Sequence, residues 1–142
     1  MTEAHEAPDV ARPASWEQLA DAVVAILERG DPAILRRHLA PGAVLWHNGD
    51  DLEVDAHDAV GSVAGLHALV DGVHVDVLRR AEIPDGFVQR FVVRGTVRAT
   101  RTELAAHNCV LATTAGGRIT RMDEYVDPTF EAQLGLAAGA PA

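Results

Sequence analysis

Residues 104–128 read LAAHNCVLATTAGGRITRMDEYVDP, and this stretch decides the fold. Its two halves, 104–115 and 118–126, have the length of β-strands and flank Gly116-Gly117. A Gly-Gly pair between two such runs is typical of a two-residue hairpin turn. The stretch therefore predicts an antiparallel hairpin towards the C-terminal end of the chain.

The register of this hairpin predicts a candidate acid/base pair. With a two-residue turn, Glu124 lies opposite Cys109, and paired positions share a face, as do positions two apart. One face is then mainly apolar and consists of His107, Cys109, Leu111, Met122, Glu124 and Val126. A carboxylate there loses solvation, which disfavours its charged form, and a nearby imidazole can share its proton. Glu124 and His107 are therefore candidate catalytic residues. A buried structural pair, or a salt bridge at a dimer interface, is the alternative.

Two further strands are expected before the hairpin, at 73–83 and 87–99, around the turn residues Pro84-Asp85-Gly86. Period-2 alternation places three residues on one face of the second strand: Phe87, Gln89 and Phe91. The two phenylalanines suit the core better than contact with a ligand. Gln89 between them needs a hydrogen-bond partner and is a candidate specificity contact.

Helices are expected ahead of these strands. Ser15 and Gln18 form a capping-box pattern at the start of the first helix, and a shorter helix follows it. After a short strand at 43–47, the apolar stripe of residues 57–70 predicts a third helix. His67 lies on this stripe, where a satisfied core histidine is favoured over a pocket role.

Helices followed by antiparallel strands form the pattern of an α+β domain. A short helix is expected after Asp127-Pro128, and no repeat or linker divides the chain. We therefore expect one domain over residues 15–136. A disordered lead-in over residues 1–14 would precede it, and a flexible tail over 137–142 would follow it.

Three passages stand out together: Val44-Leu45-Trp46-His47-Asn48, Pro84-Asp85-Gly86-Phe87-Val88 with Arg94-Gly95-Thr96, and Gly117-Arg118-Ile119 through Asp123-Glu124-Tyr125-Val126-Asp127-Pro128. With the order of elements, they resemble the SnoaL-like branch of the nuclear transport factor 2-like superfamily. The resemblance implies a cone-shaped, curved antiparallel sheet wrapped by N-terminal helices around one pocket. It also implies a small apolar molecule as ligand and a homodimer formed through the outer face of the sheet.

The resemblance also implies that Trp46 and Asn48 face the pocket from the first strand, with His47 on the other face. Core packing for Trp46 and capping of the next loop for Asn48 are the alternatives. The expected substrate-binding set is Trp46, Asn48, Gln89, Phe87, Phe91, Met122 and His67.

Members of this superfamily include polyketide cyclases, ketosteroid isomerases and limonene-epoxide-type hydrolases. One hypothesis is therefore a cofactor-free cyclase, isomerase or hydrolase acting by general acid/base catalysis. A non-catalytic ligand-binding or dimerisation module of the same fold is the other hypothesis. The epoxide-hydrolase pattern needs a second catalytic carboxylate in addition to Glu124, but Thr96 and Arg98 occupy the positions where it is expected. Tyr125, the single tyrosine, points away from Glu124 and so does not supply the oxyanion donor of an isomerase.

The composition of the chain limits the kinds of partner that it can bind. The 142 residues carry a formal net charge of −9 and include no basic run, which disfavours nucleic acid and anionic membranes as partners. The charge is compatible with both the enzyme and the binding-module hypotheses. Cys109 is the only cysteine, so no disulfide framework is expected. No nucleotide, metal or nucleophile motif is present, so no cofactor and no metal are expected, and the cytoplasm is the expected location.

Overall fold

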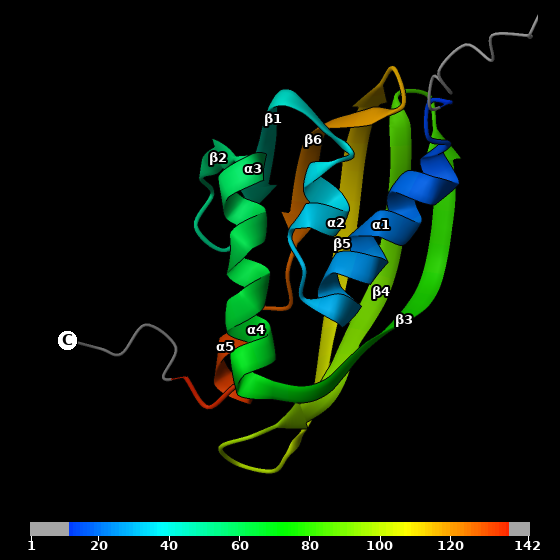
Figure 1. The fold of residues 1–142 in the computed structure, drawn as a ribbon. Helices are drawn as coiled ribbons and strands as arrows, with labels where there is room; N and C mark the ends of the chain where they lie inside the picture. Colours follow the sequence, from blue (N-terminus) through cyan, green and yellow to red (C-terminus); the bar gives the residue numbers. More distant parts are fainter. Residues whose placement is uncertain (1–11, 137–142) are drawn as a thin grey trace, which may run out of the picture.

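The computed structural model of the protein describes residues 12–136 (Figure 1). The expected lead-in over residues 1–14 lies mostly outside these residues, and the expected tail over 137–142 lies wholly outside them. The helical elements are α1 (Trp16–Arg29), α2 (Ala33–Arg36), α3 (Ala56–Ala59), a 3-10 turn at Val60–Ser62, α4 (Val63–Leu69) and α5 (Phe130–Gln133). The strands are β1 (Leu39–His47), β2 (Glu53–Asp55), β3 (Val70–Ile83), β4 (Gly86–Val97), β5 (Glu103–Ala115) and β6 (Arg118–Tyr125).

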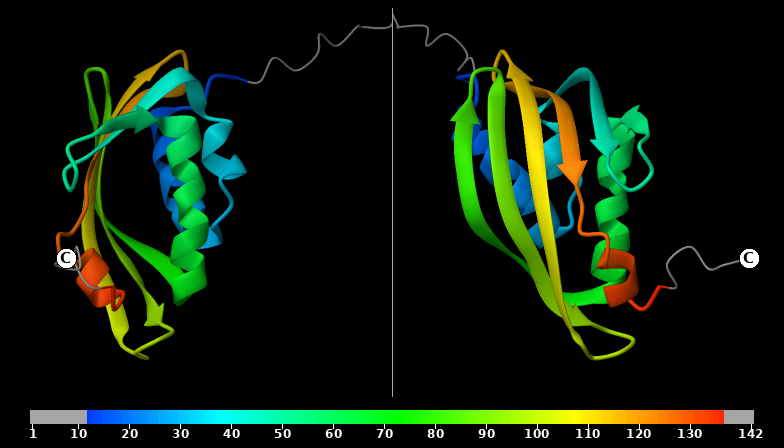
Figure 2. Two further views of the ribbon diagram at one scale, coloured as in Figure 1. Left: turned by 90° about the vertical axis from the view of Figure 1, so that its left-hand side faces the viewer. Right: turned by 180° about the vertical axis from the view of Figure 1, so that it is seen from behind.

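The strands form one curved sheet in the order β2-β1-β6-β5-β4-β3. Helices α1 to α4 cover its concave face, and the opposite face is left uncovered (Figure 2). The α+β class is confirmed, but the expected antiparallel sheet needs one correction, since β1 pairs with β6 in parallel. Many residues separate these two strands, so no turn dictates their relative direction. Within residues 12–136, no helix is long and apolar enough to cross a membrane.

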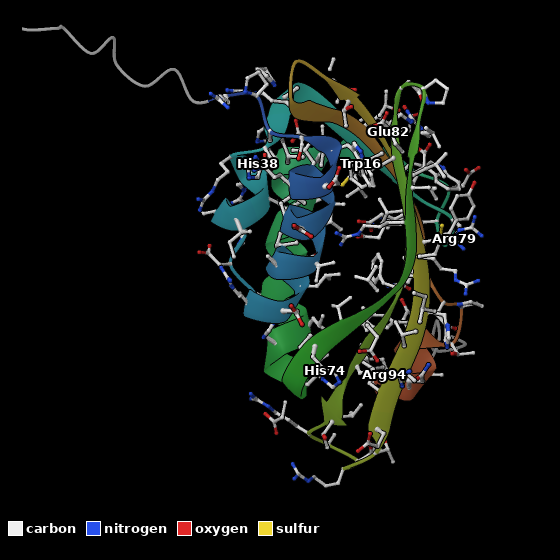
Figure 3. All side chains as sticks on the ribbon, turned by 90° about the vertical axis from the view of Figure 1, so that its right-hand side faces the viewer. Trp16, His38, His74, Arg79, Glu82 and Arg94 are labelled. Atoms are coloured by element: carbon white, nitrogen blue, oxygen red, sulfur yellow. The ribbon has the colours of Figure 1, made fainter. Side chains whose placement is uncertain are left out.

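Helix α1 packs its apolar face on the sheet. Both hydrogen bonds of the predicted capping box are present, from Gln18 N–H to the Ser15 hydroxyl at 3.2 Å and from Ser15 N–H to the Gln18 side chain at 3.0 Å. Trp16 lies between the helix and the sheet (Figure 3), with its ring centroid 6.3 Å from that of Phe87. The first turn of α1 is therefore anchored to β4 by an aromatic contact.

The third predicted helix is interrupted. Residues 57–70 were expected to form one helix, but α3 ends at Ala59 and a 3-10 turn containing Gly61 separates it from α4. Val70 at the end of the range already belongs to β3, with its φ of −129° and ψ of 128°. Glycine lowers helix propensity by about 1 kcal/mol relative to alanine, which favours a break at Gly61, although Gly65 is accommodated inside α4.

The predicted hairpin is correct at its turn and wrong beyond it. Ala115 pairs with Arg118 as expected, but Thr113 pairs with Arg121, so Thr120 is an extra residue in β6. Its hydroxyl donates a hydrogen bond to the Thr113 carbonyl at 3.2 Å. An extra residue of this kind is a β-bulge, and it moves every later residue of the strand to the other face. Glu124 consequently pairs with Val110 and not with Cys109.

The bulge divides the predicted apolar face in two. Met122 and Glu124 lie with Val110 on the concave side, under the helices, and Met122 is 0% exposed. Two members of the predicted face, His107 and Leu111, lie instead on the uncovered side, where both are exposed. The predicted pairing of His107 with Glu124 is therefore wrong, because one inserted residue reverses the alternation between them.

Candidate functional site

A cavity of about 920 Å³ lies between the helices and the concave face of the sheet. Helix α1 contributes Val23 and Ile26 to its lining, α4 contributes Leu66, and the sheet contributes Phe91 and Val110. Apolar side chains form most of the wall, which is typical of a pocket for a small molecule. The volume lies within the usual range for ligand sites.

Polar side chains gather where β1 and β6 end. Because these strands are parallel, their C-terminal ends lie at the same edge of the sheet. His47 is the last residue of β1 and Glu124 is the penultimate residue of β6, and both line the cavity. The polar lining is completed by the residues Asn48, Asp50, Ser62, Asn108, Asp127 and Glu131.

His47 and Glu124 are direct partners across the parallel strand pair. His47 Nε2 lies 2.9 Å from the Glu124 carboxylate, and the two side chains are 34% and 26% exposed. The hydrogen bond to Glu124 raises the pKa of His47 above its ordinary value of 6.5, and burial opposes this rise without reversing it. The pair can therefore hold one proton between a carboxylate and an imidazole at the polar end of an apolar cavity.

Asn48 follows His47 and connects the ends of the two strands. Its Oδ1 accepts a hydrogen bond from Val126 N–H at 2.9 Å, and its Nδ2 donates to the Val126 carbonyl at 3.3 Å. The side chain thus continues the strand pairing beyond β6. Asn48 lines the cavity as predicted, but its acceptor and one of its two amide N–H groups are committed to the backbone.

Asn108 and Asp127 form a second polar connection. Asn108 Oδ1 accepts a hydrogen bond from Asp127 N–H at 3.1 Å. The Asp127 carboxylate accepts from His107 N–H at 3.1 Å, and from the Thr129 N–H and hydroxyl at 2.9 and 2.7 Å. The Thr129 side chain contributes most to lowering the pKa of Asp127, followed by the Thr129 and His107 backbone N–H groups. Asp127 therefore stabilises the turn into α5 as a carboxylate.

Of the predicted site residues, the structure brings Glu124, Asn48 and Phe91 to the cavity. It places His107 on the uncovered face of the sheet, where only its backbone N–H contributes, through Asp127. The imidazole expected beside Glu124 is therefore supplied by His47.

Trp46 also lies away from the cavity, contrary to the prediction. Its Nε1–H donates to Asp51 at 2.7 Å, and its ring meets Tyr125 edge-on with centroids 5.3 Å apart. Leu45, which is 3% exposed, and His47 occupy the inner face of β1 instead. The resemblance assigned the two faces of this strand in reverse. Alternation from a buried Leu45 would have found His47.

The remaining predicted residues do not line the cavity, and all of them except the half-buried His67 are fully buried. Phe87 and Met122 are both 0% exposed. Gln89 is also fully buried and donates from Nε2 to the Ala20 carbonyl at 3.2 Å. His67 donates from Nε2 to the Leu27 carbonyl at 2.6 Å.

Several polar lining residues were not predicted from the sequence, among them His47, Asn108 and Asp127. A signal for Asn108 was present, because Ile119 and Met122 are apolar but three residues apart. In a regular strand this odd spacing puts them on opposite faces, so burying both requires a bulge. That bulge is what turns Glu124 towards the side of the sheet that Asn108 lines.

A model of the SnoaL-like domain matches residues 20–122, which is most of the chain. The chain belongs to the SnoaL-like domain family. Among curated proteins, no sequence matches this one. The three passages that suggested the family belong to β1, to the β3–β4 hairpin with β4, and to β6 with the turn after it.

Solved structures show the same nuclear transport factor 2-like fold for this SnoaL-like chain. IdmH of Streptomyces antibioticus, a proposed polyketide cyclase, is 22% identical with a TM-score of 0.73, over 86% of this chain and 99% of that one. AclR of Streptomyces galilaeus, a proposed hydroxylase, is 19% identical with a TM-score of 0.73, over 89% and 84%.

A third similar structure comes from Catenulispora acidiphila. It is a protein with a ketosteroid isomerase-like fold in complex with trimethylamine, 21% identical with a TM-score of 0.71, over 87% of this chain and 97% of that one. At these identities the likeness concerns the fold of the SnoaL-like domain, and the chemistry has to be argued from the site. Within residues 12–136 of this SnoaL-like chain, no three His, Cys, Asp or Glu side chains gather as metal ligands would.

Proposed function

We propose that this SnoaL-like protein is a cofactor-free isomerase or cyclase that moves a proton within a small, mainly apolar molecule containing oxygen. Glu124 is the general acid/base and His47 is its partner. The supporting observation is the 2.9 Å contact of His47 Nε2 with the Glu124 carboxylate at the polar end of an apolar cavity. A carboxylate with a partner that can hold a proton is suited to proton transfer near neutral pH.

The proton path in this proposal begins at a carbon next to a substrate carbonyl. The C–H bond breaks as an O–H bond forms on Glu124, and the electron pair remains on the substrate as an enolate. In an isomerisation, Glu124 returns the proton to a different carbon of the same molecule. In a cyclisation, the enolate carbon bonds to a second carbonyl carbon, whose oxygen takes the proton. The charge on His47 stabilises the Glu124 carboxylate between these steps.

The charge of the lining indicates which ligands fit. Four carboxylates line the cavity, those of Asp50, Glu124, Asp127 and Glu131, and no lysine or arginine of residues 12–136 does. An anionic ligand would be repelled by this set, whereas a neutral or cationic ligand would not. The Catenulispora acidiphila relative holds trimethylamine, a small amine, which agrees with this preference. The substrate we propose is therefore uncharged or basic.

The alternative is a non-catalytic binding module that uses the same cavity. It is favoured by the position of Tyr125, whose ring meets Trp46 edge-on away from the lining residues and supplies no oxyanion donor. Epoxide hydrolysis in the pattern of the superfamily, which needs an arginine between two carboxylates, gains no support, because no arginine of residues 12–136 lines the cavity. Exchange of substrate protons with solvent separates the two possibilities.

The experiment measures deuterium incorporation into 1-tetralone and 2-acetylnaphthalene in D₂O by proton NMR. We expect Glu124→Gln to lower protein-dependent exchange about 100-fold or more, which is the typical loss when a general base is removed. Glu82→Gln removes a charge from the exposed surface of β3 and serves as the matched control. If wild-type protein binds the ketones but gives no exchange above buffer, the enzyme proposal fails and the binding module stands.

We also propose that the protein is a cytoplasmic homodimer that uses the uncovered face of the sheet. That face exposes Leu111 and Tyr125 by 40% and 49%. Arg79 also extends from the side of the sheet away from the helices (Figure 3). Apolar side chains exposed within a polar surround are typical of an interface between subunits.

A further inference from the structure

The two asparagines of the chain both line the cavity, but they differ in how many hydrogen-bonding groups of the side-chain amide remain free to bind a ligand. Asn48 forms hydrogen bonds through both ends of its amide with the Val126 backbone. Within residues 12–136, the Asn108 side chain has one hydrogen-bond partner, since its Oδ1 accepts from Asp127 N–H at 3.1 Å. Among residues 12–136, no group accepts a hydrogen bond from its Nδ2.

The contact with Asp127 fixes which way the Asn108 amide is turned. A backbone N–H can only donate, so the atom facing Asp127 N–H must be the carbonyl oxygen of the amide. The NH₂ group must then point away from Asp127, and both of its hydrogens are available. If the amide turned over, its NH₂ group would face Asp127 N–H, and the hydrogen bond would be lost because both groups are donors. The orientation therefore persists without a ligand.

The register of the sheet places this donor near Glu124. Asn108 is directly paired with Phe91 on one side, and both residues line the cavity. On the other side, Glu124 pairs with Val110, two residues along the same strand. Asn108 and Glu124 are therefore diagonal neighbours, which in antiparallel pairs lie about 7–8 Å apart. A carbonyl group and its adjacent carbon fit between a donor and a carboxylate at that separation.

We propose that Asn108 Nδ2 donates a hydrogen bond to the carbonyl oxygen of the substrate, which assigns the substrate to the ketones and related carbonyl compounds. This inference rests on the proposed small-molecule function and adds the group that holds the oxygen. As a proton leaves the neighbouring carbon for Glu124, negative charge develops on that oxygen. A donor already oriented towards it stabilises the enolate without rearrangement.

The test uses 2-acetylnaphthalene labelled with ¹³C at the carbonyl, and 2-isopropylnaphthalene as a probe of similar shape without oxygen. A hydrogen bond to the ketone oxygen moves the carbonyl ¹³C resonance downfield of its value in heptane. If Asn108 had only a structural role, its replacement would not change this resonance. Asn108→Asp keeps the acceptor for Asp127 N–H and replaces the donor with a carboxylate oxygen. Gln18→Glu makes the same change from amide to carboxylate on the exposed first turn of α1, outside the cavity, and is the matched comparison.

We expect the downfield shift in wild-type protein and in Gln18→Glu, and its loss in Asn108→Asp. Ketone affinity should fall about threefold to tenfold more than hydrocarbon affinity in Asn108→Asp, as for one lost hydrogen bond. Asn108→Ala removes the amide without adding charge and should lose the downfield shift as well. This second variant keeps the inference testable if Asn108→Asp does not fold.

The inference is overturned if the ketone binds and the shift persists in either Asn108 variant. That result would leave the pocket and the role of Glu124 untouched, because deuterium exchange measures them separately. If neither naphthalene binds to wild-type protein, the inference and the proposed small-molecule function both fail.

Discussion

Glu124 and His47 face each other across two parallel strands, and His47 Nε2 lies 2.9 Å from the Glu124 carboxylate. The contact depends on elements far apart in the chain, since β1 follows the N-terminal helices and β6 closes the final hairpin. Parallel pairing puts the ends of both strands at one edge of the sheet. The pair therefore exists only when the whole sheet is assembled.

His47→Gln should lower stability in a pH-dependent way. The folded-state pKa of His47 is raised, so its contribution is fully present below 6.5 and is lost as the pH rises through the folded-state value. The free-energy difference between wild type and His47→Gln should therefore be largest near pH 6 and shrink above neutrality. We expect less than about 1 kcal/mol, because both side chains are partly exposed.

Urea unfolding of the two proteins between pH 5.5 and 9 measures this difference. Glu82→Gln, on the exposed surface of β3, is the control for a general change of charge. A difference that grows with rising pH would contradict the raised pKa of His47.

Deletion of Thr120 should be tolerated better than deletion of Asp123. Removing the bulge residue leaves Met122 and Glu124 in the alternation that already points them to the concave side. We expect a cost of about 1–2 kcal/mol for the lost local contacts, with the cavity retained. Deleting Asp123 shifts the alternation by one residue, so that Glu124 moves to the uncovered face and Tyr125 takes its place on the concave side.

Circular dichroism during thermal unfolding compares the two deletions, and equilibrium dialysis with 2-acetylnaphthalene tests the cavity. Equal stability and equal binding in both deletion variants would mean that Thr120 is not the extra residue of β6.

Ligand affinity should respond to Leu66 and not to Trp46. Leu66→Ala removes apolar wall from the cavity, so the dissociation constant of 2-acetylnaphthalene should rise about tenfold. Trp46→Phe affects a ring on the other side of the sheet, bound to Asp51, and should leave that constant unchanged. Weaker binding in Trp46→Phe, at unchanged thermal stability, would restore Trp46 to the wall of the pocket.

Replacing Leu111 with Arg should disrupt the proposed homodimer. The change places a charge in the middle of the uncovered face, where Leu111 is 40% exposed, and should cost little stability in the folded monomer. Sedimentation equilibrium should give twice the 15.1 kDa chain mass for wild type and about the chain mass for Leu111→Arg. A wild-type protein that sediments as the monomer at micromolar concentration would remove this proposal.

Local chemistry in the sequence was sufficient for the class of the fold and for most of its elements. The capping box of Ser15 with Gln18 joins residues three apart, and Gly116-Gly117 turns the chain within a hairpin. Contacts of this range depend only on neighbouring residues and their backbone preferences, so they can be read before the partners are known. The β-strands were predicted from such local patterns, and the SnoaL-like family from the resemblance of three passages together with the order of elements.

Only the tertiary structure decided which side chains meet in the cavity. Strand side chains alternate with a period of two, so the single extra residue Thr120 was enough to separate His107 from Glu124. The partner that Glu124 has instead, His47, comes from a strand paired in parallel from a distant part of the chain. The sequence by itself determined that a carboxylate and an imidazole were available. Their juxtaposition required the bulge and the parallel pairing, because both are set by packing between strands and not by local propensity.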